Sequence, residues 1–334
     1  MKYVMSISHG KETEYRRALF MLYSLFAHLS DWGDYEVILQ TDRPAWFEPW
    51  VAGLPVELRL LTKERIHQLK GEIQFVHLLK ITLLKDLLAE KLENTLFIDS
   101  DTFFLKSAES IFGWIQPGQS VMHVKEYPFS SLLESACPTR RSYGKFFTDN
   151  LLRLPGETPK LVDMNSSSWN SGVLGLSPST LPFFDDIHAM ATEIFQETRC
   201  PFSEQYAYSI CLGERTAVVP CEDVIFHYFP TWDKWAMDDY LRRLMTPWWL
   251  SQPLSRRCSD VLSRCRVLPT LIPRLPQQWR WKSLHAFGQR RFVDGYRQAF
   301  RYLLAVRGRD LSFWRDLMFV TRQIVLKPMQ RTAP

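Results

Sequence analysis

The stretch Thr95–Leu105, with the sequence TLFIDSDTFFL, joins a short apolar run to two closely spaced carboxylates. Leu96–Ile98 predicts a buried strand, and Asp99 and Asp101 follow it with Ser100 between them. Because alternate residues of a strand point the same way, both carboxylates are expected on one side, at the strand's carboxyl end. In open α/β sheets that edge is the usual ligand crevice, where paired carboxylates suit Mg²⁺ or Mn²⁺ held against a substrate phosphate. A polar turn at a strand end explains an isolated Asp-x-Asp equally well.

Phosphatases of the haloacid dehalogenase type also carry Asp-x-Asp after an apolar strand. There the motif lies on the first strand and continues with Thr or Val two positions later. Here Phe103 takes that position and several predicted elements come first. The sequence therefore disfavours this class.

Apolar periodicity predicts strands alternating with helices on both sides of the motif. Before it, the expected strands and helices are 3–8, 12–29, 34–42, 56–61 and 66–92. After it, we expect strands at 120–124, 173–176 and within 217–229, helices near 182–198 and from Ser203 as an N-cap, and a loop at 155–168. Such alternation predicts an α/β fold with a mostly parallel central sheet flanked by helices.

The charge of the 334-residue chain is divided unevenly. Residues 240–334 hold 19 Lys and Arg against 4 Asp and Glu, whereas residues 1–239 hold 22 basic and 32 acidic groups. This step predicts an acidic domain at 1–239, which the resemblance described below implies to be catalytic, and a basic, Trp- and Arg-rich helical region at 240–334, whose charge suits an anionic partner.

The six cysteines form no C-x-x-C pair and no zinc-binding spacing, which indicates reduced thiols. The first residues, MKYVMSISHG, are too short an apolar run for a signal peptide, and no stretch approaches the length of a spanning helix. We therefore expect a cytoplasmic protein, or one bound peripherally to the inner face of the cytoplasmic membrane. The sequence says nothing about the oligomeric state.

Four motifs follow one another in a recognisable order. They are Asp99-Ser-Asp101, Asn170-Ser-Gly172-Val, Glu204-Gln205, and His227-Tyr followed by Lys234-Trp. This order resembles the nucleotide-sugar glycosyltransferases with the GT-A fold, a Rossmann-like sheet. The nearest group is the retaining one that contains glycogenin and the bacterial lipooligosaccharide galactosyltransferases, over residues 3–235.

The resemblance implies a divalent metal, Mn²⁺ or Mg²⁺, bound by Asp99, Asp101 and His227 on the donor diphosphate. A purely structural role for His227 is the alternative. Lys234 would contact the diphosphate, although it lies one residue further from the histidine than in glycogenin. Lys80 would be the basic residue on the helix before the metal strand, or simply a solvated helix position.

The resemblance also assigns residues to the sugar and the nucleotide. Glu204 and Gln205 match an Asp-Gln pair beside the reacting carbon, with Glu in place of Asp, and Asn170 matches an asparagine near the donor sugar. Gly172 would let the backbone approach closely. The remaining candidates for the nucleotide site, of which uridine diphosphate is the expected ligand, are Ser8, Thr41, Asp42 and Ser100.

These roles agree with the chemistry of sugar transfer. The leaving diphosphate needs positive charge, and an oxocarbenium-like transition state needs a nearby carboxylate or amide oxygen. We therefore predict a hexosyltransferase that passes a sugar from a nucleotide donor to a glycan or lipid-linked acceptor, with retention, in polysaccharide biosynthesis. Two alternatives stay open: a nucleotidyltransferase of related fold, and an inactive relative that acts as a carbohydrate-binding scaffold.

Two interpretations fit the sequence of the basic C-terminal region. Apolar positions from Leu284 to Leu304, and again within 310–327, fall near one helix face with arginines around them. Basic amphipathic helices with aromatic residues suit an anionic membrane surface. A helical cap whose arginines face water is the alternative. No recognised module supports nucleic-acid binding.

Overall fold

The computed structural model describes residues 1–152 and 161–326, which form two compact units. Residues 1–227 and 247–265 make up the first unit, and residues 228–246 together with those from 266 onward make up the second. The expected loop at 155–168 and the end of the expected C-terminal region lie partly outside the described residues. The predicted boundary at residue 239 stays a prediction.

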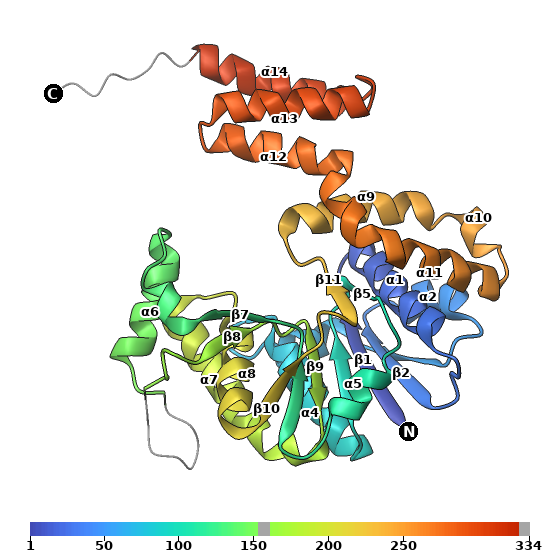
Figure 1. Cartoon of the computed structure of the whole chain (residues 1–334), viewed down its shortest axis with the longest axis vertical. Coiled ribbons are helices and arrows are strands. Elements are labelled where there is room, and N and C mark those ends of the chain that lie inside the picture. Colours follow the sequence, from blue (N-terminus) through green and yellow to red (C-terminus); the bar gives the residue numbers. More distant parts are fainter. Residues whose placement is uncertain (153–160, 327–334) are drawn as a thin grey trace. The chain divides into compact units, whose positions relative to one another are not determined.

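A seven-stranded sheet forms the centre of the first unit, with the strand order β10-β6-β9-β4-β1-β2-β3 (Figure 1). The strands are β1 (Lys2–Ser8), β2 (Tyr35–Thr41), β3 (Val56–Leu60), β4 (Thr95–Ile98), β6 (Gln119–Met122), β9 (Val173–Leu176) and β10 (Ala217–Pro220). All pairs are parallel except those that β9 makes with β4 and β6. The predicted α/β fold with a mostly parallel sheet is thus confirmed.

Successive residues of the central strands point to opposite faces of the sheet, and the residues on both faces are apolar. Both faces are therefore covered by helices. Met5, Ile38 and Phe97 belong to one buried cluster with residues of the helices named next. Those helices are α4 (Leu78–Lys91), α7 (Phe184–Thr198) and α8 (Ser203–Arg215). The alternate residues, such as Val4 and Leu96, are equally buried, and α1 (Glu12–His28) packs on β1.

Two small sheets and several short helices complete the first unit. β5 (Thr102–Phe104) pairs with β11 (Ile225–His227), and β7 (Lys125–Pro128) pairs with β8 (Ser167–Trp169). The other helices include α2 (Pro44–Val51), α3 (Lys63–Leu69), α5 (Glu109–Trp114), α6 (Pro138–Asp149) and α10 (Pro247–Leu250). Helix α11 (Leu254–Leu271) contributes its residues up to Cys265.

Three sequence expectations need correction. The helix expected over 66–92 is two helices, α3 and α4, because the chain between them turns with positive φ at Gly71 and Gln74. Ser203 is the first residue of α8 rather than its N-cap, and its hydroxyl donates to the carbonyl of Cys200. The strand expected within 217–229 is divided into β10 and β11.

The second unit is helical, as expected for a C-terminal extension. Its helices are α9 (Thr231–Leu244), α12 (Pro276–Gly288), α13 (Phe292–Ala305) and α14 (Leu311–Leu326). A small core of Ala299, Tyr302 and Phe313 joins α13 to α14. Among the described residues, no helix is both long enough and apolar enough to cross a bilayer.

Candidate functional site

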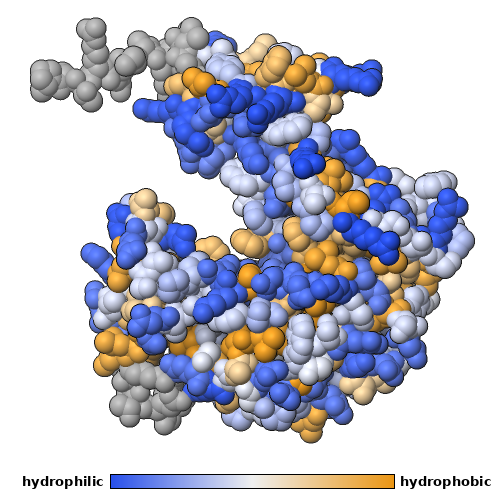
Figure 2. Space-filling model, viewed as in Figure 1, coloured by the Kyte–Doolittle hydropathy of each residue, from blue (hydrophilic) through white to orange (hydrophobic). Residues whose placement is uncertain are grey.

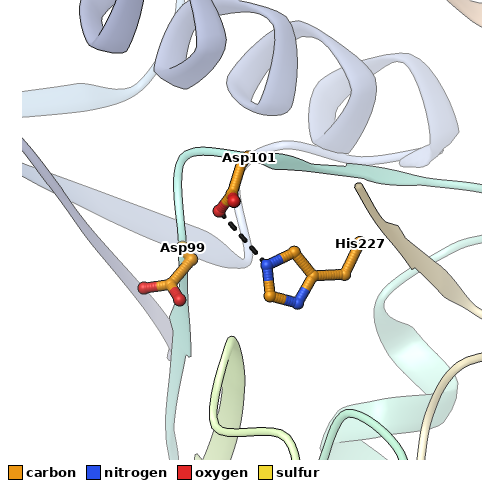
Figure 3. A group of neighbouring side chains, drawn as sticks. All are labelled: Asp99, Asp101 and His227. Atoms are coloured by element: carbon orange, nitrogen blue, oxygen red, sulfur yellow. Dashed lines mark ion pairs between the residues drawn. The ribbon is translucent and has the colours of Figure 1, made fainter. Parts of the chain in front are cut away.

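Three metal-ligand side chains meet at the end of the central strand β4. The strand ends at Ile98, and Asp99 and Asp101 follow it on the turn at its carboxyl end, as expected. β5 then leaves this turn and pairs antiparallel with β11, which sets His227 opposite Thr102. One ligand atom from each of Asp99, Asp101 and His227 lies within 4.8 Å of the others (Figure 3).

The orientation of the His227 ring is fixed by Asn170. The Asn170 side-chain oxygen accepts a hydrogen bond from the amide of Gly172 at 3.0 Å, and it lies 2.9 Å from Nδ1 of His227. Because this oxygen can only accept, Nδ1 carries the proton and donates it to Asn170. The other ring nitrogen, Nε2, faces Asp101, so a hydrogen-bonded Nδ1 and an inward-facing Nε2 give the arrangement that metal-binding histidines use.

This geometry fits a divalent cation. Nε2 of His227 is 3.2 Å from Oδ1 of Asp101, and both atoms carry lone pairs when Nδ1 holds the proton (Figure 3). Two such acceptors are stable at this distance only with a proton or a cation between them. With Asp99 beside them, the donor set is two carboxylates and one imidazole.

Gly172 makes room for the histidine. A Cβ atom added at this position would overlap the His227 ring at Cε1 and Nδ1. The glycine of the Asn-Ser-Gly-Val motif therefore admits the imidazole of this chain, and the close backbone approach expected from the sequence stays a prediction. Its neighbour Ser171 contributes to the next part of the site.

Lys80 is buried at the centre of the site, so the alternative of a solvated helix position is wrong. Its ammonium group lies 3.0 Å from Oε1 of Glu204, 3.6 Å from Oδ1 of Asp99 and 2.8 Å from the carbonyl oxygen of Ser171. Burial lowers the pKa of Lys80, but the carboxylates of Asp99 and Glu204 raise it by more, so the net direction is upward. The lysine is therefore charged and links the metal-ligand carboxylate to the predicted catalytic pair.

Glu204 and Gln205 lie side by side but join different networks. Glu204 faces Lys80 and accepts a hydrogen bond from the hydroxyl of Ser171 at 3.1 Å. The Gln205 amide donates to Glu126 at 2.8 Å and to the hydroxyl of Ser168 at 3.0 Å. Adjacent residues of α8 thus bring a carboxyl group, from Glu204, and an amide group, from Gln205, to the site.

Glu126 is a residue that the sequence reasoning missed. Its carboxylate accepts hydrogen bonds from the Gln205 amide, from the Ser168 hydroxyl and, at 3.4 Å, from the Asn170 amide. One carboxylate therefore orients two of the predicted site residues, Gln205 and Asn170. It lies in the short stretch Lys125–Pro128, which has no recognisable motif. Only the pairing of β7 with β8, 42 residues apart in the chain, brings it here.

A second missed residue is His123, whose buried ring lies 5.3 Å from that of His227. Burial and the neighbouring His227 lower its pKa to about 4. Its Nε2 lies 3.0 Å from the carbonyl oxygen of Ile225. His123 therefore braces β11, the strand that carries His227.

A cavity of about 610 Å³ opens beside these residues at the carboxyl end of β1. Ser8 lines it together with Lys80 and Asp99, and the remaining lining includes His9, Gly10, Lys11, Glu14 and His77. Buried Ser100 borders the same region, since its hydroxyl donates to Glu14 at 3.1 Å. The cavity is large enough for a nucleotide, and Asp99 belongs both to its wall and to the candidate metal-ligand group.

Thr41 and Asp42 are not among the residues that line this cavity, although Asp42 binds the amide of Gly10, which does line it. Both carboxylate oxygens of Asp42 are used, one by the amide of Gly10 and the other by the hydroxyl of Tyr15. The Thr41 hydroxyl accepts from the amide of Arg43. Lys234 lies in α9 of the second unit, and its expected contact with the diphosphate remains a prediction.

No family model matches the chain, and no curated protein matches its sequence. Among solved structures, it is similar to mouse xyloside xylosyltransferase 1 in its apo form, with 11% identity over 66% of this chain and 85% of that one, at a TM-score of 0.45. It is also similar to the glycosyltransferase GlyE of Streptococcus pneumoniae (11% identity, 78% and 63% of the chains, TM-score 0.45).

A third similar structure is the galactosyltransferase LgtC with donor and acceptor sugar analogues (12% identity, 79% and 95% of the chains, TM-score 0.44). All three are glycosyltransferases, the class that the sequence motifs resemble.

Proposed function

We propose that this chain is a divalent-metal-dependent glycosyltransferase of the GT-A type, which transfers a hexose from a nucleotide sugar to a glycan or lipid-linked acceptor. One observation carries the proposal: Asp99, Asp101 and a pre-oriented His227 converge next to a nucleotide-sized cavity. The cavity lies at the carboxyl ends of parallel strands, where open α/β sheets bind ligands.

The residues that would hold the cation are Asp99, Asp101 and His227. A mixed set of carboxylates and imidazole favours Mn²⁺ over Mg²⁺, which takes oxygen ligands almost exclusively. When bound, the cation would neutralise the leaving diphosphate. The nucleoside would occupy the cavity at Ser8 and Ser100, with uridine as the expected base, and Lys234 remains a proposed contact for the diphosphate.

The sugar would lie against Lys80, Glu204, Gln205 and Asn170. Since the Gln205 amide nitrogen donates to Glu126, its oxygen is left for the reacting carbon, where it would stabilise positive charge in the transition state. The Lys80 charge holds Glu204 in place and adds positive potential on the diphosphate side. Retention is proposed from the resemblance of the Glu204-Gln205 pair alone.

The test is to incubate the protein with a panel of UDP-sugars and Mn²⁺ and to identify the nucleotide product. Glycosyl transfer or donor hydrolysis releases UDP, and Asp101→Asn should abolish this release, whereas Glu134→Gln at an exposed position should not. Release of sugar 1-phosphate from a UDP-sugar, or of pyrophosphate when UTP and a sugar 1-phosphate are supplied instead, would identify a nucleotidyltransferase. Metal-dependent binding without turnover of any donor would favour the inactive scaffold. Proton NMR of the glycoside formed would settle retention.

A further inference from the structure

Helices α13 and α14 expose an unusual amount of apolar surface, which we call the α13–α14 surface. On α13 the residues Val293, Phe300 and Leu304 are 75%, 64% and 63% exposed. Their spacing of seven and four residues sets them on one helix face. Among the side chains that the structure describes, up to Arg322, the large apolar residues exposed on these two helices are Phe292, Val293, Tyr296, Phe300, Leu304, Leu311, Trp314, Met318 and Phe319.

The exposed stripes are not the packing faces of these helices. Each helix buries other residues: Gly295, Ala299 and Tyr302 on α13, and Phe313 on α14. Gly295 lies against the Phe287 ring of α12, which a Cβ atom there would overlap. The second unit therefore already has a core, and the stripes are a separate apolar surface. Exposed apolar patches of this kind mark interaction sites.

The surroundings of the stripes are strongly basic. Residues 289–322 contain eight arginines and three aspartates, with no lysine or glutamate. The aspartates are already engaged, since Asp310 accepts from Phe313 and Ser312, Asp316 pairs with Arg280, and Asp294 lies 3.6 Å from Arg291 and Arg297. Figure 2 shows hydrophobic residues beside strongly hydrophilic ones on this part of the molecule.

We propose that the α13–α14 surface docks onto an anionic lipid bilayer, with both helices lying in the headgroup region. Apolar side chains would enter the acyl boundary, Trp314 and Tyr296 suit the interface, and arginines such as Arg297, Arg301 and Arg315 would reach the anionic headgroups. An apolar groove on a partner protein would match the apolar side chains but not the surrounding arginines. An anionic lipid surface matches both, so charge complementarity favours the lipid surface. The proposal goes beyond the transferase activity, because docking requires neither metal nor nucleotide.

The experiment is cosedimentation of the full-length protein with phosphatidylcholine vesicles that contain or lack phosphatidylglycerol, without metal or nucleotide. We expect binding to the anionic vesicles only, weakening as salt is added. The double variant Phe300→Ser/Met318→Ser should lose about tenfold in affinity. Removing Arg301 and Arg315 by substitution with Gln should cost about fivefold for each charge.

The matched control is Leu60→Ser/Leu151→Ser, which removes two apolar side chains that are more than half exposed from the first unit and should bind like wild type. All of these residues are exposed, so unfolding curves should not change. Equal binding to both kinds of vesicle, or unchanged binding of Phe300→Ser/Met318→Ser, would overturn the proposal. So would a lipid-free dimer in sedimentation analysis that this double variant dissociates, because the surface would then join two copies.

Discussion

His227 depends on two residues of one short motif. Asn170 sets the protonated nitrogen of the ring and Gly172 leaves the space that the ring occupies. The Asn-Ser-Gly-Val stretch therefore acts on the metal site through the histidine as well as through any contact with the donor. This linkage gives the glycine a testable role.

Replacing Gly172 with Ala should displace the His227 ring and weaken Mn²⁺-dependent nucleotide binding, by about tenfold to a hundredfold, as seen when partners of metal ligands are lost. Calorimetric titration at several Mn²⁺ concentrations measures the effect. Gly213→Ala is the control, because nothing lies within 4 Å of the added Cβ and alanine is favoured in helix α8. Equal metal dependence of the two variants would show that Gly172 does not serve the histidine.

Glu126 should matter for turnover more than for nucleotide binding, because its short hydrogen bond, at 2.8 Å, is with Gln205. Its link to the candidate metal ligand His227 runs through a longer contact, at 3.4 Å, with Asn170, whose oxygen is also held by the amide of Gly172. We expect Glu126→Gln to lower the rate of donor hydrolysis by about tenfold or more through misplacement of the Gln205 amide. The affinity for UDP and Mn²⁺ should stay unchanged. A parallel loss of UDP affinity would place Glu126 in the donor site instead.

At this scale the sequence predicted the residues that carry motifs and missed their partners. Asp99 and Asp101 follow an apolar strand and could be recognised directly. Glu126 and His123 have ordinary neighbours in the chain, and they reach the site only because strands pair over long separations. Sequence periodicity contains no information about such pairings.

At the level of elements, the break between α3 and α4 decides where Lys80 points. The turn at Gly71–Gln74 ends the first helix, and Lys80 then lies in the first turn of the second helix, on the wall of the cavity. A single helix over 66–92 was expected because the apolar stripe continues on both sides of the break. Gly71 was the available signal, since positive φ favours glycine.

Lys80→Met should destabilise the protein by about 3 kcal/mol, because it leaves the buried Glu204 carboxylate without its cation. Adding Glu204→Gln should restore part of that loss, since the uncompensated charge is then removed. Denaturant unfolding of the two single variants and the double variant measures the coupling. Strict additivity of the two substitutions would contradict the buried ion pair.

For the whole molecule, the feature that the sequence predicted least well is the order in which the chain passes between the two units. The step in charge near residue 240 marks a real change of character, yet residues 247–265 pack within the first unit. They do so through Trp249, which contacts Tyr23, and through Arg257, which donates to the hydroxyl of Tyr23 and to the carbonyl of Trp50. The amino-acid composition of residues 247–265 does not distinguish them from the basic region around them, so their packing in the first unit could not be predicted.

The neighbouring tryptophans 248 and 249 test this packing. Trp249 is 3% exposed, and Trp249→Ala should lower the stability of the first unit by about 3 kcal/mol or more. Trp248 is 66% exposed, and its replacement should change stability by less than about 0.5 kcal/mol. Urea unfolding followed by circular dichroism compares them, and equal effects would argue against docking of 247–265 on the first unit.

We propose that Asp99, Asp101 and His227 bind a divalent cation that holds a nucleoside diphosphate in the neighbouring cavity. Calorimetric titration of UDP, with and without Mn²⁺, on wild type and on Asp101→Ala tests it most directly. We predict binding by wild type that requires Mn²⁺ and is lost in Asp101→Ala. Binding of UDP that is the same with and without Mn²⁺, or that survives Asp101→Ala, would contradict the account.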